Sequence, residues 1–251
     1  MHIDGFGFRV RIGAGAVLKN LSSRFMKQNQ DYKNEALKAL NGNWPQALVA
    51  TIIIILIATV LLSPDMGNRT ILMTGGAPIF PAYLTYSFSF LVILVLFPVA
   101  AGFSNSFRVL LETGDNRLTN NTFSLGFGNW LHVALGMFVM MLYISLWSLL
   151  LVIPGIIKAY SYAMTPYILV EHPELSINQA IDLSRKLMKG RKFDYFYLQL
   201  SFIGWYILSI LTLGIGFLWL TPYIECAEAS FYADVKADNG MDTVLETERV
   251  L

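Results

Sequence analysis

The sequence predicts an all-α protein, a polytopic membrane helix bundle with six transmembrane helices arranged as three hairpins. Three observations lead to this fold class. The chain of 251 residues is 55% hydrophobic and 14% charged, with a mean hydropathy of +0.53, which is too apolar for a soluble domain of this length. Uncharged stretches of membrane length recur along the chain. The basic residues fall almost entirely on one side of these stretches.

The chain divides into three regions. Residues 1–45 form a basic cytoplasmic leader, residues 46–232 a membrane domain and residues 233–251 a cytoplasmic tail. No long apolar run precedes residue 46, so the first one is expected to be a retained anchor and not a cleaved signal peptide.

Six spans are predicted within the membrane domain. They cover residues 46–62, 83–103, 130–153, 156–170, 193–213 and 215–231. The first is uncharged over about 17 residues, which make roughly 25 Å of helix. Pro154-Gly155 and Gly214 favour tight turns after the third and fifth spans, and the proline- and glycine-rich residues 63–81 are expected to form a loop.

An amphipathic cytoplasmic helix is predicted between the fourth and fifth spans, from Ile177 to Lys189. Ser176 and Gln179 form a capping box at its start, and Gly190 ends it. We expect the helix to lie on the membrane surface, although it would also suit a face of the protein itself. Its candidate contacts with anionic lipids of the inner leaflet are Arg185, Lys186, Lys189, Arg191 and Lys192.

The basic residues also predict the orientation. With the N-terminus in the cytoplasm, every Lys and Arg except Arg69 and Lys158 lies on the cytoplasmic side. The positive-inside rule therefore predicts a multi-pass plasma-membrane protein with both termini in the cytoplasm.

A short sequence repeat supports a hairpin architecture. Thr-Pro-Tyr-Ile occurs at residues 165–168 and again at 221–224, each time after a glycine-containing turn. Since the first, third and fifth spans all leave the cytoplasm, the repeat favours parallel hairpins over an inverted repeat.

Polar residues within two spans form a second candidate site. They are Lys158, Ser161, Tyr162 and Thr165 in the fourth span, and Thr221, Glu225 and Glu228 in the sixth. Each set falls on one helix face, so the two would form a polar seam for an ion or part of a lipid, with Lys158 and Glu225 as partial partners. In the alternative, Lys158 reaches the outer headgroups, Glu228 reaches the inner interface, and Glu225 alone needs a buried partner or a proton.

No catalytic, metal or cofactor site is predicted. The three histidines, His2, His132 and His172, have no metal-ligand spacing, and Cys226 lies in an apolar stretch without a neighbouring base. Residues 5–15 are glycine-rich but lack the lysine of a phosphate-binding loop. The diluted basic charge without a binding motif argues against nucleic acid as a partner.

Three stretches of the C-terminal half carry a resemblance to a known family. They are LWSLLLVIPGIIKAYSYAMTPYILVEHPELS, AIDLSRKLMKGRKFDYF and LQLSFIGWYILSILTLGIGFLWLTPYIECAEASFY. These stretches resemble a family of uncharacterised bacterial integral membrane proteins, domain of unknown function 975, and NGNWPQAL at the first span matches it more loosely. The Ile-Pro-Gly turn and the amphipathic helix are more distantly similar to the membrane domain of some glycerophosphodiester phosphodiesterases.

The resemblance implies a multi-pass protein of a bacterial plasma membrane and brings no activity with it. The chain has no room for the separate catalytic domain of the phosphodiesterases. It departs from the family over residues 1–30, which look like an extension, and at Glu225 and Glu228, where neutral residues are expected.

The leading functional hypothesis is a non-enzymatic membrane protein that interacts with lipid or with a membrane partner, a second copy of the chain included. The alternative is a small-solute or ion transporter or channel that uses the polar seam. An intramembrane enzyme ranks third, because no nucleophile, base and orienting group can be assembled from the residues at hand.

Overall fold

The computed structural model describes residues 29–73 and 92–239, and every regular element in these ranges is a helix. Residues 1–28, 74–91 and 240–251, with most of the leader, the start of the second predicted span and most of the tail, lie outside the described residues. The helices are α2 (Asn29–Leu40), α3 (Trp44–Met73), the π-helix η1 (Val92–Leu96), α5 (Phe97–Thr113), α6 (Leu118–Gly128), α7 (Trp130–Leu150), α8 (Val152–Tyr162), α9 (Thr165–Glu171), α10 (Ile177–Leu187), α11 (Lys192–Leu200), α12 (Ile203–Leu211) and α13 (Phe217–Asp238). The predicted all-α class is confirmed.

Three of these helices are long and apolar enough to cross a membrane. The qualifying segments are Trp44–Leu61 in α3, Leu94–Thr113 in η1 and α5, and Trp130–Leu150 in α7. They overlap the first three predicted spans. The loop predicted from residue 63 was wrong up to Met73, because α3 continues through Pro64. A proline removes one backbone N–H donor, and the helix continues through the backbone hydrogen bonds of the neighbouring residues.

The last three predicted spans are not continuous apolar helices. The fourth is divided into α8 and α9 at residues 163–164, and the fifth into α11 and α12 at residues 201–202. The sixth coincides with α13, which carries Glu225, Glu228 and Asp234 in every stretch of membrane length. Six spans are therefore not confirmed by the described residues.

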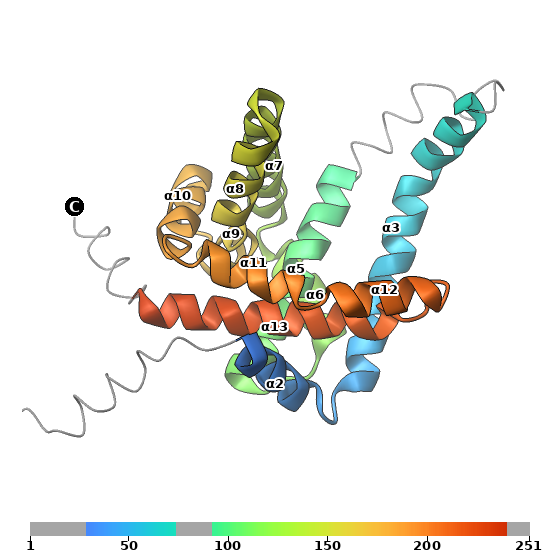
Figure 1. Ribbon diagram of the computed structural model, residues 1–251, viewed down its shortest axis with the longest axis horizontal. Helices are drawn as coiled ribbons and strands as arrows, with labels where there is room; N and C mark the ends of the chain where they lie inside the picture. The colour runs from blue at the N-terminus through green and yellow to red at the C-terminus, as the bar shows by residue number, and fades with distance from the viewer. Residues whose placement is uncertain (1–28, 74–91, 240–251) are drawn as a thin grey trace, which may run out of the picture.

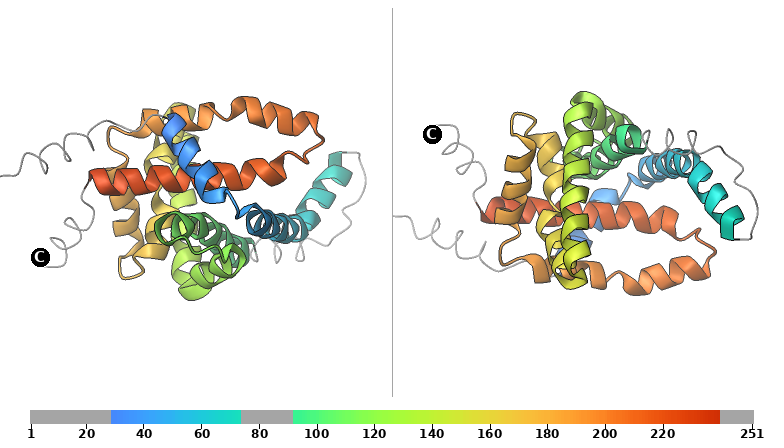
Figure 2. Two further views of the ribbon diagram at one scale, coloured as in Figure 1. Left: turned by 90° about the horizontal axis from the view of Figure 1, so that it is seen from below. Right: turned by 90° about the horizontal axis from the view of Figure 1, so that it is seen from above.

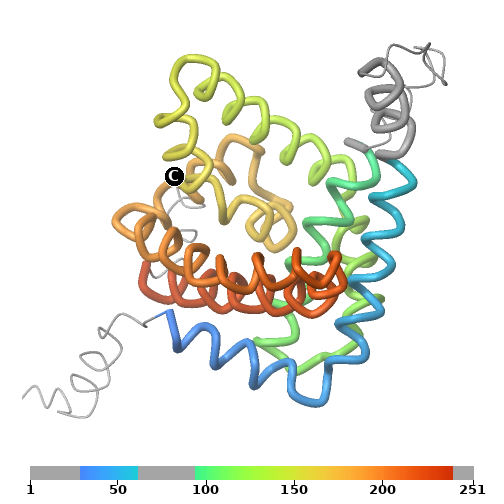
Figure 3. Tube along the Cα trace, turned by 45° about the vertical axis from the view of Figure 1, so that its right-hand side comes forward, coloured from blue at the N-terminus to red at the C-terminus, as the bar shows by residue number. Residues whose placement is uncertain are grey.

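Helix α13 organises the bundle. It lies crosswise to α3 and α7 (Figures 1 and 2) and packs against α2, α5 and α3. Helices α11 and α12 fold back from it as the other arm of a hairpin, while α7 and α8 form a second hairpin that rises away from α13 (Figure 3). Because α13 runs crosswise to α3, the two helices cannot both be parallel to the membrane normal.

The core lies where α13 meets α2 and α9. Tyr32 of α2 packs edge-on against Phe231, with ring centroids 5.3 Å apart, and Tyr167 of α9 stacks on Tyr232 at 4.7 Å. All four side chains are buried. Aromatic pairs of this kind contribute about 0.5–1.5 kcal/mol each beyond their burial, so they fix α2 and α9 on α13.

The outer surface is strongly apolar at the ends of both hairpins. Leu149, at the tip of the α7–α8 hairpin, is 86% exposed, and Leu213, at the tip of the α12–α13 hairpin, is 94% exposed. Leu56 and Val60 extend this surface along α3. Apolar patches of this kind mark surfaces that contact lipid or another protein.

The two hairpins close through the same kind of contact. A Cβ on Gly155 would lie 2.1 Å from Ser148 Oγ, and one on Gly216 would lie 2.7 Å from Ser209 Oγ, so in both turns a glycine lets a serine of the preceding helix approach closely. The repeated Thr-Pro-Tyr-Ile opens α9, which follows the α7–α8 hairpin, and lies inside α13 in the other hairpin. The two hairpins thus share a turn contact, while the repeated tetrapeptide occupies different helical positions.

Candidate functional site

The capped helix α10 carries most of the candidate site. Ser176 Oγ accepts a hydrogen bond from the Gln179 amide at 3.4 Å, and the Ser176 amide donates to Gln179 Oε1 at 2.8 Å. The predicted capping box is therefore confirmed, and it fixes where the helix begins.

The apolar face of α10 packs inside the protein and not on a membrane. Ala180, Ile181, Leu183 and Leu187 are all buried. Of the two placements that suit the sequence, packing on the protein is the one found for this face, which corrects the expected surface position. The basic face of α10 remains exposed.

Ser184 fixes α10 to the break between α8 and α9. Its hydroxyl donates to the Ser161 carbonyl at 3.0 Å and accepts from the Met164 amide at 3.2 Å. Both backbone groups lie where α8 ends, so a buried side chain satisfies them in place of the helix ladder. The basic face of α10 is thereby held beside the last two turns of α8.

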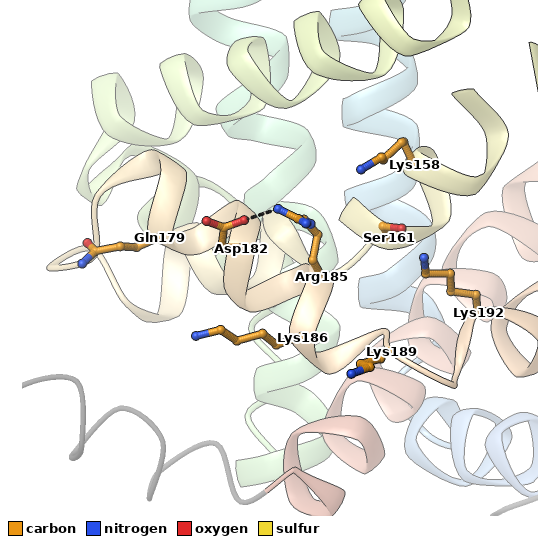
Figure 4. Close-up of a pocket in the computed structure, with 8 residues that line it drawn as sticks. All are labelled: Lys158, Ser161, Gln179, Asp182, Arg185, Lys186, Lys189 and Lys192. Atoms are coloured by element: carbon orange, nitrogen blue, oxygen red, sulfur yellow. Dashed lines mark hydrogen bonds and ion pairs between the residues drawn. The ribbon is translucent and has the colours of Figure 1, made fainter. Parts of the chain in front are cut away.

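A basic pocket forms between α8, α10 and the start of α11 (Figure 4). We use this name for the cavity of about 640 Å³ that is lined by Lys158, Ser161, Gln179, Asp182, Arg185, Lys186, Lys189 and Lys192. Five of these side chains are cations and one is an acid. Asp182 accepts from Arg185 Nη1 at 2.5 Å, so it neutralises one cation at most.

The cations of the basic pocket point in two directions. Figure 4 shows Lys158 and Lys192 with their amines turned toward the space beside Ser161, and Arg185 with its guanidinium turned toward Asp182, whereas Lys186 and Lys189 extend away from these three. We call the first three, which come from α8, α10 and α11, the inner cations. Like charges repel at such close quarters, so this arrangement favours an anionic ligand.

A second cavity adjoins the basic pocket across Lys158. It measures about 530 Å³, and its further lining side chains include Tyr143, Trp147 and Tyr162. Lys158 Nζ lies 4.5 Å from the centroid of the Trp147 ring, a cation–π contact that orients the lysine. Lys158 and Arg185 line both cavities, so a ligand can contact them from either side.

The structure separates the two halves of the predicted polar seam. Lys158 and Ser161 line the basic pocket, Tyr162 lies in the adjoining cavity, Thr165 is buried in α9 and Thr221 is half-buried in α13.

The two carboxylates of the predicted seam have other partners. Glu225 accepts from Ser104 Oγ of α5 at 2.6 Å. Glu228 accepts from Tyr195 at 2.8 Å and from Gln199 Nε2 at 2.7 Å. Lys158 therefore turns toward the basic helix, whereas Glu225 faces α5.

Arg191 does not lie with the four other predicted lipid contacts. It is 8% exposed, and its guanidinium donates to Asp234 Oδ2 at 2.6 Å and to the Tyr32 hydroxyl at 3.0 Å. It also pairs with Asp194, at 3.0 Å, and with Asp238. Burial lowers the pKa of Arg191, but the hydrogen bond to Asp234 and the charges of Asp234 and Asp238 together raise it by more, so the net shift is upward. Arg191 thus joins α2, α11 and α13.

Sequence reasoning missed two features of the basic pocket. Asp182 reads as an ordinary solvated charge, although its position three residues before Arg185 is a known signal for a helix ion pair. No local pattern places Lys158 beside α10, because that contact depends on the break between α8 and α9.

The described residues contain no group of three or more His, Cys, Asp or Glu side chains that could hold a metal ion. Cys226 is a buried free thiol whose Sγ lies 3.8 Å from the Ala36 carbonyl. The chemistry that the basic pocket supports is the binding of an anion through charge-assisted hydrogen bonds.

Comparison with protein families gives a match. The family described as "protein of unknown function (DUF975)" matches residues 82–239, which is more than half of the chain and includes the whole basic pocket. No curated protein and no solved structure matches the chain.

Proposed function

Because the chain belongs to the DUF975 family, whose description names no activity, we propose a function from its geometry. The protein is a non-enzymatic integral protein of the bacterial plasma membrane, and its basic pocket binds the headgroup of an anionic phospholipid. The observation that carries this proposal is the convergence of Lys158, Arg185 and Lys192 from three separate helices on one cavity.

The surroundings of the basic pocket suit a lipid. On α8, the exposed side chains of Ile156 and Ile157 directly precede Lys158, and the tip of the hairpin beyond them is apolar. A headgroup in the pocket would therefore leave its acyl chains beside an apolar surface. Each basic residue near an anionic membrane contributes about 1 kcal/mol of attraction, so the excess of cations in the basic pocket makes anionic lipid a preferred neighbour.

We propose that the last three predicted segments lie in the bilayer with α3, α5 and α7, and that both termini are cytoplasmic. Because α13 runs crosswise to α3, this arrangement requires both helices to be tilted from the membrane normal. The apolar exteriors of α12 and of the α12–α13 tip support this placement. If the chain crosses the bilayer six times, the tip at Leu213 lies on the outer face. If the α12–α13 hairpin lies along the cytoplasmic surface instead, Leu213 stays on the cytoplasmic side.

Cysteine labelling tests the six crossings. In a Cys226→Ala background, a cysteine in place of Leu213 should react with a membrane-impermeant maleimide added to intact cells, while one in place of Asn116 should react only after lysis. Labelling at position 213 only after lysis would disprove the six-span arrangement.

Lipid binding is tested on the purified full-length chain in a neutral detergent. Removing two inner cations, as in Lys158→Gln with Lys192→Gln, should weaken binding of phosphatidylglycerol by about 2 kcal/mol, or roughly 30-fold. The matched control, Lys38→Gln with Arg117→Gln, removes the same charge from exposed positions outside the basic pocket and should change binding little. Equal losses in the two double variants would refute a site in the pocket.

We do not propose transport through the predicted polar seam. That alternative needs Lys158 and Glu225 in one cavity, and the hydrogen bond between Glu225 and Ser104 places the carboxylate against α5.

A further inference from the structure

The number and direction of the inner cations point to a particular class of headgroup. We propose that the basic pocket selects lipids that carry a terminal phosphate monoester, as in phosphatidate, over lipids whose phosphate is a diester. This inference rests on the proposed lipid binding and adds the chemical class of the ligand.

The geometry provides for one anionic group with several oxygens. Lys158, Arg185 and Lys192 come from three elements and line one cavity, so a single anion in that cavity can be reached from all three elements. Asp182 engages Arg185 through Nη1, and the guanidinium keeps its other donors for a ligand. The Ser161 hydroxyl donates to the Ile157 carbonyl at 2.7 Å, so its proton is not available to a ligand.

The charge of a monoester matches this arrangement better than that of a diester. A phosphate monoester carries about −1.5 to −2 at pH 7 and has three terminal oxygens, whereas a diester in a lipid carries a single negative charge. The three inner cations less the paired Asp182 leave a net charge of about +2, which a monoester neutralises more completely. Each additional charge-assisted hydrogen bond adds to the preference.

The apolar neighbours of Lys158 favour a lipid over a free phosphate compound. Ile156 is 51% exposed and Ile157 is 49% exposed, and Leu149 and Val152 continue the apolar surface to the hairpin tip. Acyl chains would cover these side chains, which a water-soluble phosphate compound leaves bare.

The pH dependence of binding separates the two headgroup classes. The second ionisation of a phosphate monoester lies near pH 6, and a diester has none. No histidine lines either cavity in the described part of the chain. The ionisable groups that line them are Tyr143 of α7, Lys158 and Tyr162 of α8, Asp182, Arg185 and Lys186 of α10, Lys189 after it and Lys192 of α11. A change in affinity between pH 5.5 and 7.5 would therefore report the charge of the ligand.

The experiment measures binding of phosphatidate, phosphatidylglycerol and phosphatidylcholine to the full-length protein in neutral detergent, at both pH values. We expect phosphatidate to bind about tenfold more tightly than phosphatidylglycerol at pH 7.5, with the ratio falling toward one at pH 5.5. Lys158→Gln with Lys192→Gln should remove the preference, and Lys158→Arg should retain it. Lys186→Gln with Lys189→Gln should weaken both anionic lipids equally, because these lysines extend away from the inner cations.

The outcomes distinguish the two proposals. Equal and pH-independent binding of both anionic lipids, above that of phosphatidylcholine, would overturn the monoester preference and leave the proposed function standing. Binding of neither anionic lipid above phosphatidylcholine would overturn the proposed function itself. Glycerol 3-phosphate is the water-soluble competitor. If it displaced phosphatidate at equal concentration, the ligand would be a free phosphate compound, and the proposed lipid ligand would be wrong.

Discussion

The hydroxyl of Tyr32 donates a hydrogen bond to Asp234 at 2.7 Å, although 202 positions separate the two residues in the sequence. The same hydroxyl accepts from Arg191 at 3.0 Å, so one tyrosine of α2 contacts both members of the ion pair between α11 and α13. Burial, followed by the hydrogen bond to Asp234, holds the pKa of Tyr32 well above its usual value. The hydroxyl therefore stays protonated and remains a donor.

Tyr32→Phe should destabilise the fold by about 1–3 kcal/mol, since it leaves buried polar groups of Asp234 and Arg191 without this partner. At about 2–4 °C per kcal/mol for a chain of this size, the thermal unfolding midpoint in detergent should fall by several degrees. Tyr197→Phe is the control, because Tyr197 is 56% exposed. Unfolding midpoints that are the same in both variants would contradict the structural role of Tyr32.

Glu171 should make the protein sensitive to acid. Burial raises the pKa of this carboxyl, but hydrogen bonds from Lys236 and Tyr232 and the charge of Arg108 lower it by more, so the folded pKa lies below the ordinary value of 4.5. A lowered folded pKa gives stability that is complete above about pH 4.5 and is lost as the pH falls through the folded pKa.

The unfolding midpoint should consequently fall between pH 5 and pH 3 in the wild type, and it should fall less in Glu171→Gln. Asp31→Asn, which changes an exposed carboxylate of α2, is the control and should keep the wild-type profile. A profile of Glu171→Gln as steep as the wild type would show that Glu171 does not contribute to this sensitivity.

Gly102 should tolerate no side chain. A Cβ there would lie 2.0 Å from the Thr122 carbonyl oxygen and 2.7 Å from the Gly126 nitrogen, both backbone atoms of α6. Gly102→Ala therefore forces α5 and α6 apart, and we expect a loss of about 1–3 kcal/mol in the free energy of unfolding. Gly128→Ala is the matched control, because nothing lies within 4 Å of a Cβ at Gly128. Thermal melting followed by size exclusion compares the two, and equal stability would count against this close approach.

Features that depend on a few neighbouring residues could be predicted from the sequence. The capping box of Ser176 and Gln179 lies within one helical turn, and the apolar segment of α7 is continuous, so both follow from local pattern. The second half of the chain was harder because its apolar runs are interrupted. The break at residues 163–164 is held by the buried hydroxyl of Ser184, and no local pattern shows that a residue twenty positions later would satisfy the freed backbone groups.

The sequence predicts most of the residues of the candidate site, but it does not predict which of them lie together in the folded protein. The sequence identifies the basic side chains near α10, yet its pattern predicts a seam between Lys158 and Glu225. Arg191 and Lys192 are neighbours in sequence, but one lies in a buried ion network and the other in the basic pocket, because Arg191 is the N-cap before α11 and Lys192 is the first residue of that helix. The direction of each side chain depends on where α11 begins, which the charge pattern alone does not reveal.

The three helices that supply the inner cations meet only in the native chain. A peptide copy of α10 would keep Arg185 but lose Lys158 and Lys192, so it would adhere to any negative surface without choosing among headgroups. Selectivity among headgroups therefore reports whether the tertiary structure is intact. Gentle heating that separates α8 from α10 should abolish the preference for one headgroup before it abolishes binding to anionic membranes.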